Sequence, residues 1–81
     1  MSGKILIADD SLRTRDAAAA ALGPRGGELL LVADGQAALD RLHESRPALV
    51  IADIHMAKKD GYTVCREAKA LHPGIAVLLL V

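Results

Sequence analysis

The chain has 81 residues, enough for one small domain, and its 10 basic and 10 acidic residues give a formal net charge of zero. Interspersed charges of both signs argue against a nucleic-acid-binding protein, and the single cysteine excludes an intrachain disulfide. The longest apolar run, Ile75–Val81, is far below the ~20 residues of a membrane span, so we expect a soluble cytoplasmic protein with no membrane partner.

Short apolar runs alternate with helix-like stretches along the chain. Lys4–Ala8 predicts a buried strand, Ser11 can cap a helix running to about Leu22, and the glycines and proline of residues 23–27 end that helix in a turn. The later predicted strands are Glu28–Val32, Ala48–Ala52 (opened by Pro47) and Ile75–Val81. The later predicted helices run from Gln36 to about Ser45 and from Gly61 to Leu71. A polar loop at Asp53–Asp60 and a turn at His72–Gly74 connect them.

Strands that alternate with helices predict βαβ units with right-handed crossovers, and therefore an α/β fold with a parallel sheet. Helical spacing of apolar residues identifies the faces that pack on this sheet. On the second and third predicted helices these residues are Ala38, Leu39 and Leu42, then Val64, Cys65, Ala68 and Leu71.

Two of the apolar strands end in acidic residues. Asp9 and Asp10 follow the first strand and Asp53 follows the third, so the three carboxylates converge if these strands are neighbours. Three such anions repel one another and call for a cation, and carboxylate oxygens are the ligands that Mg²⁺ prefers. With the metal bound, one carboxylate can attack phosphorus and form an aspartyl phosphate. Alternatively, Asp9 and Asp10 simply begin a loop or cap the first helix.

Four linked blocks of sequence carry a family resemblance that spans the whole chain. They are Ile5–Ser11 (ILIADDS), Ala33–Leu39 (ADGQAAL), Arg46–Met56 (RPALVIADIHM) and Asp60–Tyr62 (DGY). In this order and spacing they resemble the receiver domain of two-component response regulators. The resemblance implies a flavodoxin-like, doubly wound parallel sheet, with strand order 2-1-3-4-5 in a complete domain.

The resemblance also implies roles for individual residues. Asp53 matches the phosphoacceptor, and Asp9 and Asp10 match the acid pair that binds Mg²⁺, with Asp10 the direct ligand. Asp53 and the backbone carbonyl of His55 complete the metal site. The implied phosphoryl donor is a histidine kinase, and the implied recipient of the signal is an output domain or effector protein. The chain is then a signalling module and not an enzyme acting on an external substrate.

Some family features differ or lie beyond this sequence. Ala57 stands where the family usually has proline, and the usual Ser or Thr after the fourth strand and Lys after the fifth would come after Val81. We therefore interpret residues 1–81 as an incomplete receiver domain with strand order 2-1-3-4, lacking the last strand and the last two helices. Lys58 or Lys59 could replace the usual lysine, although loop lysines are more often simply solvated.

Two other functions stay open at this point. A pseudo-receiver, which acts as a protein-interaction module without phosphorylation, would need neither the lysine nor the hydroxyl. A flavin or nucleotide binder on the same fold is disfavoured because no phosphate-cradling glycine loop occurs.

The predicted packing leaves one face of the sheet incompletely covered. The first helix should lie on one face, and the second and third helices on the other. The third and fourth strands would then be bare on the first helix's face, with the fourth strand an open apolar edge. From this we predict a homo-oligomer joined through the fourth strand.

Overall fold

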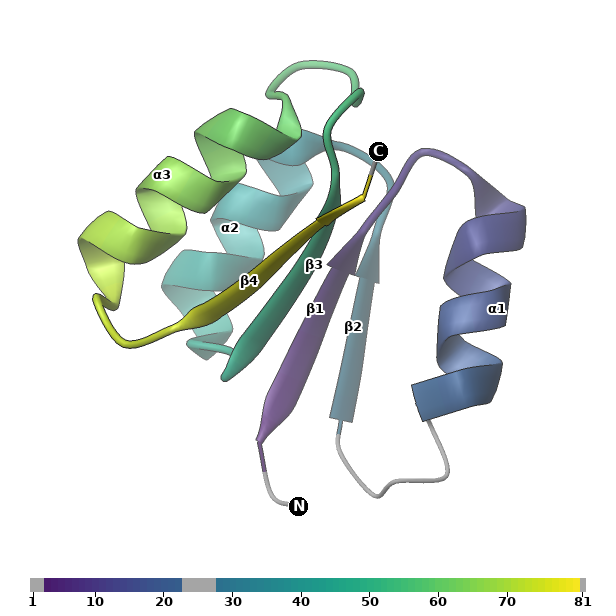
Figure 1. Ribbon diagram of the computed structural model, residues 1–81, viewed down its shortest axis with the longest axis horizontal. Helices are drawn as coiled ribbons and strands as arrows, with labels where there is room; N and C mark the ends of the chain where they lie inside the picture. The colour runs from purple at the N-terminus through teal and green to yellow at the C-terminus, as the bar shows by residue number, and fades with distance from the viewer. Residues whose placement is uncertain (1–2, 23–27, 81) are drawn as a thin grey trace.

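A computed structural model describes residues 3–22 and 28–80 of the chain, arranged as a parallel sheet between two helical layers (Figure 1). The predicted turn at residues 23–27 and residue Val81 lie outside the described residues. The strands are β1 (Lys4–Ala8), β2 (Glu28–Val32), β3 (Leu49–Asp53) and β4 (Ala76–Leu80), and the helices are α1 (Leu12–Leu22), α2 (Gly35–Ser45) and α3 (Gly61–Leu71).

The four strands are parallel and follow the order β2-β1-β3-β4, which confirms the predicted flavodoxin-like arrangement. The register pairs Ala8 with Val32 on one side and with Ala52 on the other. The carboxyl ends of β1 and β3 are therefore level with each other, and the residues that follow them emerge side by side at one edge of the sheet.

Three strand boundaries differ from the sequence prediction. Asp53 pairs with Leu80 and belongs to β3, whereas we expected it to open the loop. The same strand begins at Leu49, one residue later than expected, and the N–H of Ala48 before it donates to the Lys4 carbonyl at 2.8 Å. At β4 the strand starts at Ala76, because the N–H of Ile75 is taken by a turn bond to the His72 carbonyl at 2.9 Å.

The main core lies between the sheet and the layer of α2 and α3. Aliphatic side chains from β1, β2, β3, α2 and α3 meet there, together with Ile75 just before β4. Its buried members are Leu6, Ala8, Val32, Ala38, Leu42, Val50, Ala52, Val64, Ala68 and Ile75. The predicted inward residues Leu39 and Cys65 are partly buried, but Leu71 is 37% exposed because α3 ends at that residue and no further turn holds it against the sheet.

Among the described residues, the opposite face of the sheet is covered by α1 alone, over β1 and β2 (Figure 1). Ile5 and Ile7 of β1 are buried, whereas Leu78 and Leu80 on the same face of β4 are 56% and 37% exposed. The incompletely covered face predicted from the sequence is therefore present among the described residues.

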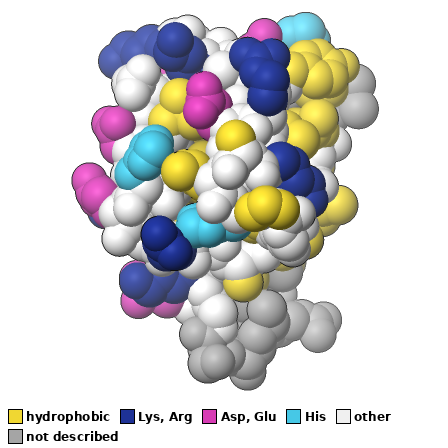
Figure 2. Space-filling model, turned by 90° about the vertical axis from the view of Figure 1, so that its left-hand side faces the viewer, with side chains coloured by type: hydrophobic (Ala, Val, Ile, Leu, Met, Phe, Trp, Pro, Cys, Tyr) yellow, Lys and Arg dark blue, Asp and Glu magenta, His cyan; other side chains and the backbone are white. Residues whose placement is uncertain are grey.

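The outer surface of the α2 and α3 layer carries charges of both signs, interspersed with apolar and histidine side chains (Figure 2). None of the helices in residues 3–22 and 28–80 combines the length and the apolar character needed to cross a membrane.

Candidate functional site

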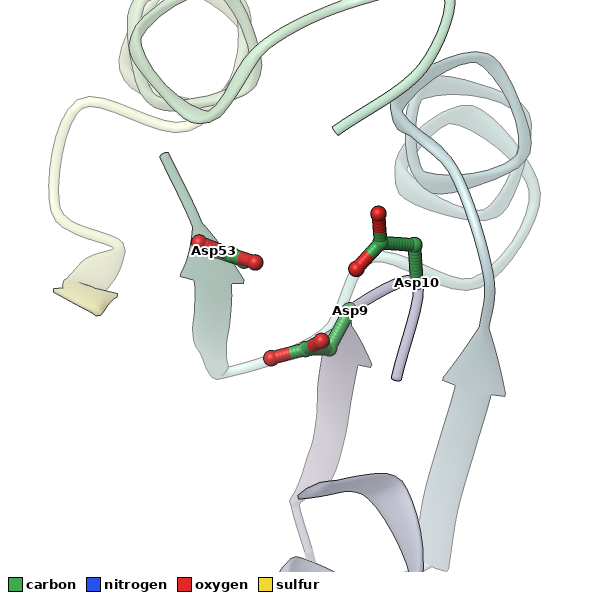
Figure 3. Close-up of side chains that lie close together, drawn as sticks. All are labelled: Asp9, Asp10 and Asp53. Atoms are coloured by element: carbon green, nitrogen blue, oxygen red, sulfur yellow. The ribbon is translucent and has the colours of Figure 1, made fainter. Parts of the chain in front are cut away.

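Three carboxylates meet at the carboxyl edge of the sheet, as the sequence predicted (Figure 3). Asp9 and Asp10 leave the end of β1, and Asp53 ends the neighbouring β3. One carboxylate oxygen from each lies within 4.8 Å of the other two. The strand register produces this convergence, because Ala8 and Ala52 are directly paired and the acids follow them.

The three side chains differ in burial and in their hydrogen bonds. Asp9 is only 4% exposed, and its Oδ1 accepts from the N–H of Ser11 at 2.8 Å. Asp53 is half-buried and its Oδ1 accepts from the N–H of His55 at 3.2 Å, while Asp10 is exposed. The cluster thus combines a buried carboxyl group held by a hydrogen bond, that of Asp9, with an exposed one, that of Asp10.

No lysine or arginine among the described residues forms an ion pair with these carboxylates. The ion pairs present there join Arg41 to Glu44 and Lys58 to Asp34. Three clustered anions without a protein cation suit a hard divalent metal, since Mg²⁺ takes oxygen ligands from one or two carboxylates and fills its other positions with water or phosphate oxygens. The donor set therefore fits Mg²⁺.

Backbone hydrogen bonds and a close backbone contact at Gly61 restrain the loop that follows Asp53. The N–H of Ile54 donates to the Leu80 carbonyl at 3.1 Å, and the N–H of Gly61 donates to the Ile54 carbonyl at 3.0 Å. A Cβ placed on Gly61 would stand 2.5 Å from the backbone oxygen of Asp53, so only glycine fits where α3 begins. The sequence predicts Gly61 only as the start of a helix, and its contact with the Asp53 backbone is visible only in the structure.

Helix α3 begins at an aspartate cap that also ends this loop. Asp60 accepts from the N–H of Thr63 at 2.8 Å, and this hydrogen bond, helped by the charge of Arg66, holds the pKa of Asp60 below its ordinary value. A lowered folded-state pKa means that the charged form stabilises the fold above the unfolded pKa, and that this contribution is lost as pH falls through the folded pKa.

We therefore expect Asp60→Ala to lower the urea midpoint of unfolding at pH 7, with the difference from the parent shrinking as pH falls below about 4. Urea titrations followed by circular dichroism at several pH values measure this. Asp60→Asn is the matched control because it keeps a capping oxygen without a titrating charge. A deficit of the alanine variant that stays constant down to pH 2.5 would contradict the assignment.

The other loop residues singled out from the sequence lie outside the carboxylate cluster. Lys58 is 66% exposed and its Nζ lies 3.8 Å from Asp34 Oδ2, so it pairs with Asp34 and not with the three clustered carboxylates. Lys59 is exposed, and His55 is exposed with its N–H directed to Asp53. The role of the His55 carbonyl as a metal ligand stays a prediction.

Comparisons with known proteins agree on one family. Residues 5–81 match the model of the response regulator receiver domain. The chain is 44% identical over 66 residues to a probable transcriptional regulator ycf27 of Galdieria sulphuraria, covering 82% of this chain and 26% of that protein. It is 32% identical over 80 residues to the response regulator MprA of Mycolicibacterium vanbaalenii, covering 99% of this chain and 35% of that protein.

A solved structure shares the fold. The BeF3-activated DrrB receiver domain superposes with a TM-score of 0.88 at 25% identity, over 98% of this chain and 65% of that one. The chain thus spans about a quarter to a third of the length of these curated relatives, and about two thirds of that receiver domain.

Proposed function

Because this chain belongs to the family of response regulator receiver domains, we propose that Asp53 accepts a phosphoryl group from a histidine kinase in a Mg²⁺-dependent transfer. The observation that carries the proposal is the carboxylate cluster, which brings Asp9, Asp10 and Asp53 within 4.8 Å at a strand end open to solvent. Receiver domains are signalling domains, and we assign no chemistry on an external substrate to this chain.

In the proposed transfer, a carboxylate oxygen of Asp53 attacks the phosphorus of a phosphohistidine. The new O–P bond forms as the P–N bond breaks, and the kinase imidazole leaves with the electron pair and is protonated from solvent. Bound Mg²⁺ would neutralise the charge on the transferring phosphoryl oxygens. Asp9 and Asp10 would hold the ion, with the His55 carbonyl as a further ligand.

The surroundings of Asp53 support its role as the nucleophile. Its Oδ1 is oriented by the N–H of His55, and the backbone on either side is fixed by the pairing with Leu80 and by the tight start of α3 at Gly61. A fixed nucleophile needs less reorganisation to reach an in-line attack. Asp9, by contrast, is buried, and Asp10 lies beyond the end of β1.

The experiment that tests this function is intact-mass spectrometry after incubation with Mg²⁺ and acetyl phosphate, a small acyl-phosphate donor. We expect one phosphoryl adduct per chain, and none when EDTA replaces Mg²⁺. An adduct that forms equally well in EDTA would contradict the metal requirement, and no adduct under either condition would favour a phosphorylation-independent interaction module.

The downstream partner is a further part of the proposal. The curated relatives are named as regulators, and this chain spans about a quarter to about a third of their length. We propose that the phosphorylated domain acts on an output domain or an effector protein, the output that the sequence resemblance implied.

The exposed leucines of β4 lead to a prediction about association. We propose that the 81-residue chain forms a homo-oligomer through this strand, because parallel strands are normally covered on both faces and Leu78 and Leu80 are not. Light scattering at micromolar concentration should give at least a dimer, and Leu78→Glu should give a monomer. Leu31→Glu, at the opposite edge strand β2, is the matched control and should stay associated. A parent chain that is a monodisperse monomer would contradict the proposal.

A further inference from the structure

The loop between β3 and α3 contains a strained turn. Lys58 has a φ of 70°, in the region that side chains other than glycine rarely adopt. The N–H of Lys59 donates to the carbonyl of Ala57 at 2.8 Å, which closes a three-residue γ-turn around Lys58. The γ-turn with positive φ is the rare, strained form, and such a conformation persists only when its surroundings hold it in place.

The surroundings that hold this turn come from the start of α2. The N–H of Gly35 donates to the same Ala57 carbonyl at 3.3 Å. Gly35 is buried, and a Cβ placed on it would overlap the backbone carbonyl of Lys59 and stand 2.5 Å from the Lys59 Cβ. The two backbones are therefore in direct contact at a position that only glycine can occupy.

The residue before Gly35 adds a second link to the same turn. Asp34 Oδ1 caps α2 by accepting from the N–H of Ala37 at 2.8 Å, while its Oδ2 lies 3.8 Å from Lys58 Nζ. Lys58 is mostly exposed, so this ion pair is weak and the close backbone contact at Gly35 carries most of the restraint. The start of α2 thus faces the tip of the loop at the carboxyl edge of the sheet (Figure 1).

We propose that Gly35 is a positioning residue for the metal site. It holds the Ala57–Lys59 turn, and through the short segment back to Asp53 it fixes the backbone of His55, whose carbonyl is the predicted metal ligand. The backbone hydrogen bonds of Ile54 and Gly61 restrain the two ends of this loop. The contact with Gly35 restrains its middle, the Ala57–Lys59 turn. This inference rests on the proposed function, and Gly35 touches neither the metal nor the phosphoryl group.

The test is a Mg²⁺ titration by isothermal calorimetry of the parent chain, Gly35→Ala and Gly74→Ala. Gly74 is the matched control, since a Cβ there meets nothing within 4 Å. We expect Gly35→Ala to bind Mg²⁺ about 10-fold more weakly, the usual effect of losing an outer support of a metal site, and Gly74→Ala to bind like the parent. A Gly35→Ala chain with a native circular dichroism spectrum and parental affinity would overturn the proposal.

A measurement on the parent chain decides the question if Gly35→Ala does not fold. If Gly35 supports Mg²⁺ binding through the Ala57–Lys59 turn, then Mg²⁺ binding must in turn affect Gly35, because coupling between two sites is reciprocal. Saturating Mg²⁺ should therefore shift the amide resonance of Gly35 and slow its hydrogen exchange, and leave Gly74 unchanged. A Gly35 amide that does not respond while Mg²⁺ binds would overturn the positioning role alone. A parent chain that binds no Mg²⁺ would overturn the proposed function as well.

Discussion

Replacing Asp53 by asparagine should abolish the phosphoryl adduct while leaving the fold intact. The amide is isosteric with the carboxylate, and its Oδ1 can still accept the hydrogen bond from the N–H of His55. It lacks the anionic oxygen that attacks phosphorus, so transfer has no nucleophile at this position. Intact-mass spectrometry should show no adduct with Mg²⁺ and acetyl phosphate, alongside an unchanged circular dichroism spectrum.

Asp60→Asn is the control for this experiment. Asp60 lies at the other end of the same loop and is exposed, but its carboxylate is engaged at the start of α3. We expect this variant to be phosphorylated like the parent. An adduct that survives in Asp53→Asn and disappears in Asp60→Asn would show that the acceptor has been assigned to the wrong carboxylate.

Replacing Leu42 by alanine should remove a large part of the unfolding free energy of the domain. Leu42 is fully buried between α2 and the sheet, and truncating such a leucine costs about 2–5 kcal/mol through lost transfer free energy and the cavity left behind. A chain of this length has a total unfolding free energy of roughly 4–12 kcal/mol. Urea denaturation followed by circular dichroism should show the midpoint falling to low urea, or a chain already largely unfolded in buffer.

Leu12→Ala serves as the comparison for Leu42→Ala. Leu12 begins α1 and is 64% exposed, so its truncation should change the unfolding free energy by no more than about 0.5 kcal/mol. Equal losses in the two variants would contradict the described core, in which the packed interface lies between the sheet and the layer of α2 and α3.

Much of the fold could be predicted because local pattern and topology agree along this chain. The apolar runs and helical spacing located every strand and helix, and the alternation of the two implied a parallel sheet. The convergence of Asp9, Asp10 and Asp53 followed from one further assumption, that β1 and β3 are neighbours, which the register confirms. The exposure of Leu78 and Leu80 among the described residues also followed, since α1 was expected on that face of the sheet and α2 and α3 on the other.

The features that sequence reasoning missed depend on contacts between segments distant in sequence. From the sequence, Gly35 is an ordinary turn residue and Gly61 an ordinary helix start. In the structure, a Cβ on Gly35 would clash with the Lys59 backbone, and a Cβ on Gly61 would clash with the Asp53 backbone. The strained turn at Lys58 gives no sequence signal, because lysine does not favour a positive φ and only the contact with α2 accounts for it. The sequence pattern places Asp53 at the start of the polar loop, whereas its pairing with Leu80 keeps it in β3.

The central claim is that Asp53 carries the phosphoryl group. The most direct measurement is borohydride reduction of the phosphorylated parent chain, which converts a phosphorylated aspartate to homoserine, followed by peptide mapping. We predict conversion at Asp53 alone, and only in samples phosphorylated with Mg²⁺ present. Conversion at Asp9, Asp10 or Asp60, or a phosphoryl adduct with no converted aspartate, would contradict the account.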